Sequence, residues 1–333
     1  MSATTETQKG AATSGRRGFS LPTSADWFFL PVFLVVAALF PFFFDSGSTV
    51  LDTGVLALAY TVMALGLNII VGFAGLLDLG YVAFYAIGSY TMGWMGSLFF
   101  DSLNHQKGIH IFVKGAADRL PGLHVNFLFV LVIAVVFTTI AGMIIGLPTL
   151  RLRGDYIAIV TLAFGEIIGR LAVNGDELKI FGQPLTAGRQ GITPVDKISL
   201  PGINPFTSLD LRPWYFVALV LVAVALFVNL MLRDSRLGRA WIALREDEVA
   251  AVAMGVPAVR TKLLAYGTGA AFGGMAGAFL GSYNNTVNAD QFQFYFSILI
   301  LGMVILGGLG SIWGVVLGAI ALTSINFYFI PNT

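Results

Sequence analysis

The sequence predicts an all-α polytopic membrane protein with about nine transmembrane helices, a broken helix near residues 72–80 and a short cytoplasmic helix. Two observations predict this class. Hydrophobic residues make up 56% of the 333 residues and charged residues only 11%, whereas a soluble domain carries about 25% charge. The charge is also distributed unevenly, because long charge-free runs alternate with short charged segments.

Charge and cysteine content exclude several classes of protein. The formal net charge is +1, which argues against a nucleic-acid-binding protein because such proteins carry a basic surplus. Cysteine is absent, so disulfides, thiolate metal sites and cysteine nucleophiles are excluded.

The charge-free runs locate the membrane spans, since a helix that crosses a bilayer needs about 20 mostly apolar residues. The span expected at 156–172 is the weakest, because it carries Glu166 and Arg170. A glycine-rich turn at residues 307–310 is expected to separate the last two spans. The nine expected spans are residues 27–44, 51–71, 80–100, 125–147, 156–172, 213–232, 262–282, 292–306 and 311–330.

The remaining segments are assigned by their composition and basic residues. Residues 1–25 are rich in Ser, Thr, Gly and Ala and are expected to be a disordered tail, and residues 26–333 form a single transmembrane domain. Lys and Arg near span ends favour the cytoplasmic side. Their distribution places the N-terminus and the 233–261 loop in the cytoplasm and the 174–212 loop outside.

The stretch of residues 68–81 is the most informative part of the apolar region. Three glycines flank Asp78 between two apolar runs, and glycine weakens a continuous helix. The Asp78 carboxylate can accept hydrogen bonds from the first free N–H groups of the helix that follows. One interpretation is an ordinary capped turn at the cytoplasmic face. The other is a discontinuous helix of the kind that lines substrate paths in transporters.

Charged residues inside a span are functional candidates by default. Glu166 and Arg170 are four residues apart, with the acid N-terminal, so they can also pair on a helix and simply orient it. Both interpretations stay open from the sequence.

Glycines recur every fourth residue in two of the expected spans, which places them along one helix face. Small residues let helices approach closely in lipid. These stripes therefore predict helix packing, and they are also compatible with helices that slide during a transport cycle. The glycines are Gly269, Gly273, Gly277, Gly281, Gly310, Gly314 and Gly318.

The 233–261 loop has the densest charge in the chain. Good helix formers from Arg245 to Met254 predict one amphipathic helix of about three turns, which Gly255 and Pro257 end. An imperfect apolar stripe runs along it, formed by Trp241, Leu244, Val249, Val252 and Met254. Such a helix can lie on a membrane or dock on a partner protein, and the mixture of both charge signs favours a protein partner.

Motifs for catalysis are missing from the sequence. It has no phosphate-binding Gly-x-x-x-x-Gly-Lys loop, no dinucleotide fingerprint and no His-Glu-x-x-His. The three histidines, His105, His110 and His124, share one outer loop with few acidic residues, so no metal site is expected. A membrane-embedded enzyme is therefore disfavoured.

Four blocks, in order along the chain, resemble the permease subunits of high-affinity branched-chain amino acid ABC importers. They are residues 67–88 (LNIIVGFAGLLDLGYVAFYAIG), 147–168 (LPTLRLRGDY through EII), 238–255 (GRAWIALREDE through G) and 300–312 (ILGMVILGGLGSI). The family is related to urea and short-chain amide permeases. The sequence departs from the family in reading LTAGRQGI at 185–192, where LTGGPxGI is usual, and in ending at Thr333, where relatives often continue through a further apolar segment.

The resemblance implies a non-catalytic subunit of an importer in a bacterial plasma membrane. It implies a second, related permease, two ATP-binding subunits that hold ATP and Mg, an extracytoplasmic substrate-binding protein, contact with membrane lipid and no nucleic acid. This chain itself is expected to hold no cofactor and no metal. The residues expected to couple to the ATPase are Arg245, Glu246, Asp247, Glu248, Ala250, Ala251 and Gly255, and the residues expected along the translocation path are Asn68, Asp78, Tyr81 and Glu166.

Two other functions compete with a permease for branched-chain amino acids. A permease for urea or short amides would share most of the four blocks. A secondary transporter driven by an ion gradient would also use broken helices with acidic residues, but it would not need a charged docking loop. ATP dependence of uptake separates the importer from the secondary transporter.

Overall fold

The computed structural model describes residues 23–101, 108–113, 120–150, 152, 156–180, 182–199 and 205–332. The tail expected at residues 1–25 lies outside these residues except for its last three, which belong to the first helix. The helices are α1 (Thr23–Leu39), α2 (Thr49–Leu67), α3 (Val82–Met95), α4 (Phe127–Thr149), α5 (Tyr156–Asn174), α6 (Arg212–Asp234), α7 (Arg236–Glu246), α8 (Glu248–Ala253), α9 (Ala258–Tyr283), α10 (Phe294–Gly307), α11 (Ile312–Ser324) and α12 (Ile330–Asn332).

Shorter elements complete the chain. Two π-helices extend helices of the bundle, η2 (Asn68–Phe73) after α2 and η8 (Ile325–Phe329) after α11. The strands β1 (Gly96–Ser97), β3 (Leu123–Val125) and β2 (Ile109–Ile111) form one small sheet in that order, in which β1 is antiparallel and β2 parallel to β3. A hairpin joins β4 (Lys179–Ile180) to β5 (Gln183–Pro184). The 3-10 turns are η1 (Phe40–Phe42), η3 (Leu98–Phe100), η6 (Gly188–Gln190) and η7 (Ala289–Gln291).

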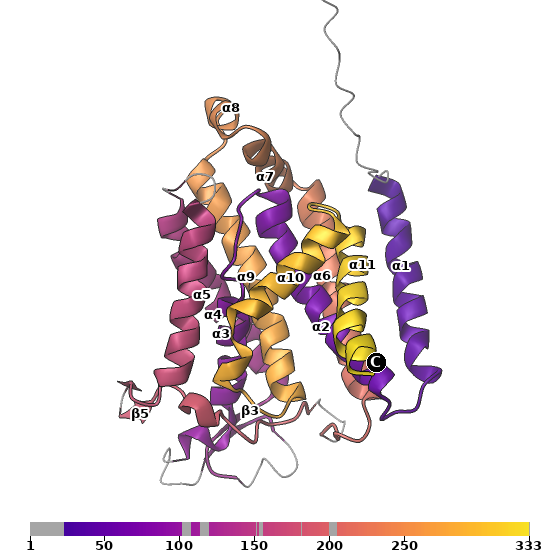
Figure 1. Ribbon diagram of the computed structural model, residues 1–333, viewed down its shortest axis with the longest axis vertical. Helices are drawn as coiled ribbons and strands as arrows, with labels where there is room; N and C mark the ends of the chain where they lie inside the picture. The colour runs from indigo at the N-terminus through magenta and orange to yellow at the C-terminus, as the bar shows by residue number, and fades with distance from the viewer. Residues whose placement is uncertain are drawn as a thin grey trace, which may run out of the picture.

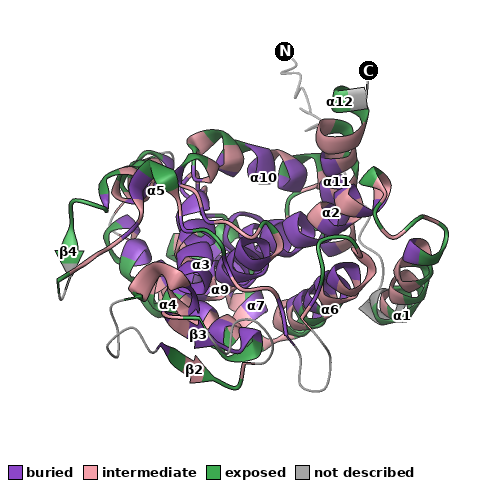
Figure 2. Cartoon of the chain, turned by 90° about the horizontal axis from the view of Figure 1, so that it is seen from below, coloured by how far each residue is buried: buried purple, intermediate pink, exposed green. Residues whose placement is uncertain are grey.

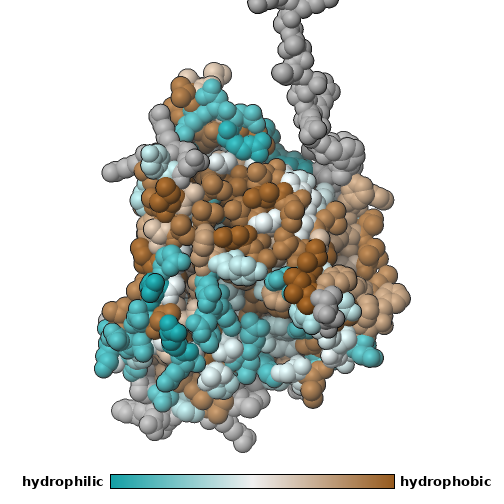
Figure 3. Space-filling model, in the orientation of Figure 1, coloured by the Kyte–Doolittle hydropathy of each residue, from teal (hydrophilic) through white to brown (hydrophobic). Residues whose placement is uncertain are grey.

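The protein is an all-α polytopic membrane protein. Seven of its described helices are long and apolar enough to cross a membrane. The expected spans at 27–44 and 80–100 correspond to shorter helical segments, Trp27–Phe42 and Val82–Met95. Hydrophilic residues gather over α7 at one end and over the opposite end of the molecule, with hydrophobic surface between them (Figure 3).

The helices α2 and α9 form the centre of the bundle. In the most apolar stretches of α2 and α9, 89% and 78% of the residues are buried, whereas only 28% are buried in the corresponding stretches of α4 and α5. Seen from below, the buried residues lie around α2, α3 and α9, and exposed residues lie on the outer helices (Figure 2). Helix α9 packs most extensively against α3 and α4. The outer faces of α4 and α5 therefore meet lipid or another protein.

Most of the glycines expected to pack helices lie at close crossings, but Gly310 lies in the turn before α11 instead of on a helix. A Cβ on Gly277 would strike the backbone of α3 at Tyr85, and a Cβ on Gly269 would meet Ile70 and the backbone of Gly66. Gly314 and Gly318 lie against the backbone of α10 in the same way. Gly281 differs, because its nearest neighbours would be at ordinary contact distance, 3.4 Å.

The two ends of the bundle carry different structures. The helices α7 and α8 extend beyond the bundle at one end, and the described strands lie at the other (Figure 1). The first turn of α1 lies at the same end as α7, in agreement with the side expected for the N-terminus and the 233–261 loop relative to the 174–212 loop. The expected turn at residues 307–310 is present, because α10 ends at Gly307 and both Gly308 and Gly310 have positive φ.

Candidate functional site

The chain breaks between α2 and α3 and crosses part of the bundle in an extended segment. Helix α2 continues as η2 to Phe73, and α3 begins only at Val82. In Figure 1 the connecting segment descends beside α2 before α3 starts. Non-helical backbone is tolerated at membrane depth only where it is buried in protein or lines a wet cavity. The structure shows a discontinuous helix, whose connecting segment begins beside α7 and runs back along the bundle.

Side chains from three segments satisfy the backbone of this break. Asp78 Oδ1 accepts from the N–H of Gly80 at 2.8 Å. Thr161 of α5 accepts from the N–H of Leu79 at 3.0 Å, and Ser297 of α10 accepts from the N–H of Val82 at 3.0 Å. Asp78 thus caps a residue just before α3 rather than the first turn of the helix. Its second oxygen, Oδ2, has no hydrogen-bond partner among the described residues.

Two further candidate path residues join helices to one another. Tyr81 is fully buried and donates from its hydroxyl to the carbonyl of Gly269 in α9 at 2.9 Å. Asn68 is also buried, and its Oδ1 accepts from the N–H of Gly310, between α10 and α11, at 2.9 Å. Ser297, which completes the start of α3, was not found from the sequence, because a lone serine in an apolar span gives no distinctive signal.

Glu166 does not join these residues. It is exposed on α5, as is Arg170 one turn later, and no ion pair joins the two side chains. The structure thus places Glu166 on the outside of the bundle, apart from Asn68, Asp78 and Tyr81.

The segment between α6 and α9 forms two helices, so the prediction of one continuous helix from Arg245 to Met254 was wrong. Asp247 is extended, with φ −153°, and its carboxylate accepts from the N–H of Ala250 at 3.0 Å. Aspartate competes for backbone N–H groups in this way and favours a cap over a helix interior. The break turns α8 away from α7. As a result, the expected apolar stripe is divided between two helices, with Trp241 and Leu244 on α7 and the remaining residues on or directly after α8.

Helix α7 is fastened to the start of α9. Trp241 is fully buried and donates from its indole N–H to the carbonyl of Thr261 at 2.8 Å. Lys262, whose side chain is 7% exposed, pairs with Glu248 of α8 at 2.7 Å. Lysine is rarely buried without such a partner. These two contacts attach α7 and α8 to α9, a central helix of the bundle.

The expected coupling residues differ in the direction they face. Glu246, Asp247, Ala250 and Gly255 are exposed, whereas Ala251 is buried and Glu248 pairs with Lys262. Arg245 is also exposed, but its guanidinium donates to the carbonyl of Gly72 in η2 and pairs with Glu246 at 3.2 Å. The outermost surface of α8 is apolar and consists of Val249, Val252 and Met254, which are 73%, 49% and 86% exposed. We call these three residues the α8 tip.

A buried histidine stabilises the opposite end of the molecule. His124 Nδ1 lies 2.6 Å from Asp196 Oδ2, and the ring of His110 stacks on it at 5.4 Å between centroids. Burial opposes the charged imidazolium, but the carboxylate of Asp196 and the carbonyl of Pro121 raise the pKa of His124 above its ordinary value. His105 lies outside the described residues, and within them no group of three His, Asp or Glu side chains could hold a metal ion.

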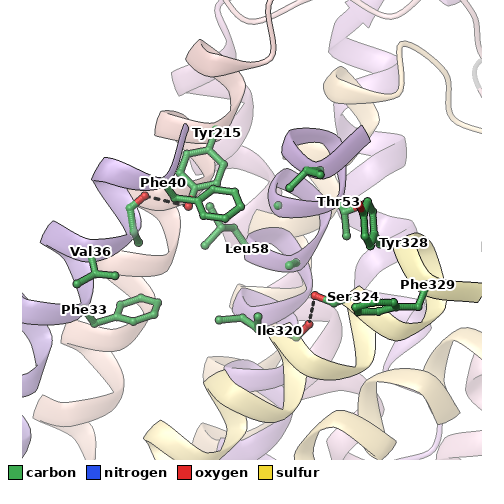
Figure 4. Close-up of a pocket in the computed structure, with 14 residues that line it drawn as sticks. Phe33, Val36, Phe40, Thr53, Leu58, Tyr215, Ile320, Ser324, Tyr328 and Phe329 are labelled. Carbon is green, nitrogen blue, oxygen red and sulfur yellow. Dashed lines mark hydrogen bonds between the residues drawn. The ribbon is translucent and has the colours of Figure 1, made fainter. Parts of the chain in front are cut away.

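One apolar cavity of about 360 Å³ opens between α1, α2, α6 and the end of α11 (Figure 4). Its few polar groups are engaged within the chain, because Tyr215 donates to the carbonyl of Ala37 at 3.0 Å and Ser324 to that of Ile320 at 2.8 Å. The cavity contains no charged side chain. It therefore lacks groups for the charged ends of an amino acid.

Comparisons with known proteins agree with this architecture. Residues 49–331 match the family described as the permease component of branched-chain amino acid transport systems. The high-affinity branched-chain amino acid transport system permease protein LivM of Escherichia coli (strain K12) is 38% identical over 95% of this chain and 72% of its own length. LivM of Salmonella typhimurium is 38% identical over 88% of this chain and 66% of its own length.

A third relative is the permease protein LivH of the same Escherichia coli system, which is 31% identical over 35% of this chain and 36% of its own length. No solved structure matches the chain. The family match covers the broken helix, the cytoplasmic helices and the glycine-rich turn before α11. The chain therefore belongs to the family of permease components of branched-chain amino acid transport systems.

Proposed function

We propose that this chain is a transmembrane permease subunit of an ATP-driven importer that translocates branched-chain amino acids across the bacterial plasma membrane. The observation that carries the proposal is the attachment of α7 and α8. They project from the bundle, yet Trp241 and Lys262 fasten them to its central helix. A force applied to the projecting helices would thus reach the packed helices directly.

The α8 tip supports an ATP-hydrolysing protein as the partner that applies this force. Val249, Val252 and Met254 expose an apolar surface at the end of a charged segment. An exposed apolar patch rimmed by polar residues marks a protein interface, and a helix laid in a groove is a common way to form one. In this proposal two separate subunits bind ATP and Mg, and this chain holds no cofactor and is not catalytic.

The outer face of α5 supports a second permease subunit beside this one. A charged side chain at the centre of a bilayer costs about 2.5–3.5 kcal/mol on insertion scales, so such residues face protein or water. Glu166 and Arg170 are exposed on the surface of this chain. A second subunit or a water-filled path beside α5 would keep them away from lipid. LivH and LivM are two permease proteins of one named system, and a related sister permease fits this arrangement.

The two ends of the bundle indicate where the remaining partners would bind. If α7 and α8 face the cytoplasm, then the first turn of α1 does too, and the strands with the β4–β5 hairpin face outward. An extracytoplasmic substrate-binding protein would dock there. The names of the LivM relatives support branched-chain amino acids as substrate, and the apolar interior suits their side chains.

Reconstituted transport tests the proposal. The assembled complex would be placed in proteoliposomes with binding protein outside and ATP inside, and uptake of labelled leucine would be measured, with urea as the competing substrate. We expect uptake of leucine that requires ATP. Uptake that persists without ATP and collapses with an ion gradient would contradict the importer and favour a secondary transporter. Uptake of urea in place of leucine would contradict the substrate.

A further inference from the structure

Arg245 brings together three segments that are far apart in the sequence. It lies in the last turn of α7, and its guanidinium donates to the carbonyl of Gly72 in η2. The same nitrogen lies beside the turn between α10 and α11, where a Cβ on Gly310 would come within 3.2 Å of it. One cytoplasmic side chain therefore contacts both the broken helix and the last turn of the bundle.

These two membrane segments also touch each other directly. The N–H of Gly310 donates to Asn68 Oδ1 at 2.9 Å, and a Cβ on Gly72 would approach the Gly310 nitrogen to 2.6 Å. Gly75, with φ +69°, leaves space for the aliphatic part of Arg245. We call Asn68, Gly72, Arg245 and Gly310 the clasp.

The end of η2 explains why the clasp needs a cation. The last carbonyls of a helix have no partner within it. Here the following N–H groups turn back to earlier residues, Ala74 to Ile69 at 3.1 Å and Leu76 to Ile70 at 3.0 Å. The Gly72 carbonyl is therefore left for Arg245, and cations near a helix C-terminus are favoured by its dipole.

We propose that Arg245 is a positioning residue that holds the break after α2 against the α10–α11 turn and releases it when α7 moves. The movement of α7 that would release the clasp rests on the proposed function. The contacts that close the clasp do not depend on that function. Withdrawal of the guanidinium would uncap Gly72 and free η2 from the turn. Since the clasp lies where the broken helix meets α7, its opening would admit water from the cytoplasmic side.

Cysteine labelling tests the clasp, because the chain has no cysteine of its own. Ala74→Cys places a thiol at a buried position directly after η2. The full complex in inside-out vesicles would be treated with a membrane-impermeant maleimide, and labelling of this chain would be followed over time. We expect Arg245→Gln to speed labelling about tenfold, the factor expected from losing one hydrogen bond to a charged group.

Arg239→Gln is the matched control, because Arg239 lies on the same helix but bonds to the carbonyl of Asp234 instead of the break. We expect its labelling rate to equal that of the parent. Arg245→Lys, which keeps the charge but not the forked guanidinium, is expected to give an intermediate rate and serves if Arg245→Gln does not assemble. Parent-like labelling in an assembled Arg245→Gln or Arg245→Lys complex would overturn the proposal.

Labelling in the presence of nucleotide tests whether the partner subunit opens the clasp. With ATP and vanadate, we expect the labelling rate of the parent to change, because α7 moves with its partner, and that of Arg245→Gln to stay at its already raised rate. A parent rate that nucleotide leaves unchanged, in a complex shown to transport, would overturn the release step. A complex that does not transport at all would instead contradict the proposed function. The difference in labelling rate between the parent and Arg245→Gln without nucleotide would then still test the clasp.

Discussion

Polar side chains inside this bundle satisfy backbone groups that an unbroken helix would satisfy itself. Asp78, Thr161 and Ser297 accept from three N–H groups around the start of α3. A buried N–H without a partner costs about 1–3 kcal/mol. The break is therefore a fixed structure, and each of these side chains contributes to its stability.

Substitution of Asp78 separates its capping oxygen from its charge. Asp78→Asn keeps an acceptor for the N–H of Gly80, whereas Asp78→Ala removes it. We expect Asp78→Ala to lose about 1 kcal/mol more stability than Asp78→Asn, the usual value of a cap. Unfolding of the purified chain in detergent measures the difference, and equal stability of the two variants would contradict the capping role.

His124 predicts a pH dependence at the outer end of the molecule. Its pKa is higher in the folded protein than the ordinary value of 6.5, so the charged form stabilises the fold. That contribution is complete below pH 6.5 and is lost as the pH rises through the folded pKa. We expect melting temperatures to fall over this window in the parent and in His110→Gln but not in His124→Gln. An unchanged slope in His124→Gln would assign the dependence to another group.

At the scale of elements, close backbone contact at glycines joins α9 to its neighbours. Gly277 lies against the backbone of α3, which cannot move as a side chain can. Gly302 of α10 differs, since a Cβ there would meet only the end of Leu322 at 3.7 Å. The two positions thus form a matched pair of glycines inside helices.

We expect Gly277→Ala to destabilise the protein by about 1–3 kcal/mol, the usual cost of overpacking. Gly302→Ala should be neutral or stabilising by up to about 1 kcal/mol, because alanine favours helix over glycine. Denaturant unfolding in detergent compares the two variants. A Gly277→Ala variant as stable as Gly302→Ala would show that the α3–α9 crossing does not depend on glycine.

The positions of the elements followed from apolar runs and glycines, but the direction of several side chains did not. Charge-free runs predicted the helices, and the glycines around Asp78 predicted the break. The split at Asp247 was missed because helix propensity in neighbouring residues outweighed one capping side chain. The contact of Arg245 with Gly72 and the outward direction of Glu166 depend on how helices turn about their axes, which tertiary packing decides.

In the whole molecule, Trp241 and Lys262 attach α7 and α8 to a bundle whose centre is α2 and α9. Gly255 lies directly after α8, exposed, with φ +91° and no atom near a Cβ. A side chain there would meet no packed atom of this chain, although the positive φ strains residues other than glycine. It would, however, project into any partner that covers the α8 tip.

Gly255→Asp is therefore expected to uncouple ATP hydrolysis from uptake, because it places a charge in that interface. Gly255→Asn has the same shape and the same tolerance of positive φ without the charge, and it should keep most of the uptake. We expect uptake by Gly255→Asp to fall about tenfold or more relative to Gly255→Asn. Parallel assays of leucine uptake and phosphate release measure both, and equal uptake by the two variants would place Gly255 outside the interface.

Photo-crosslinking tests whether the α8 tip docks on an ATP-hydrolysing subunit, as we propose. A photoreactive residue in place of Met254, which is 86% exposed, would be irradiated in the purified complex, with the same residue at Leu209, 85% exposed at the opposite end, as the control. We expect an adduct between this chain and the ATP-hydrolysing subunit from position 254 and none from position 209. An assembly that contains this subunit but gives no such adduct from position 254 would show that the α8 tip does not dock on it.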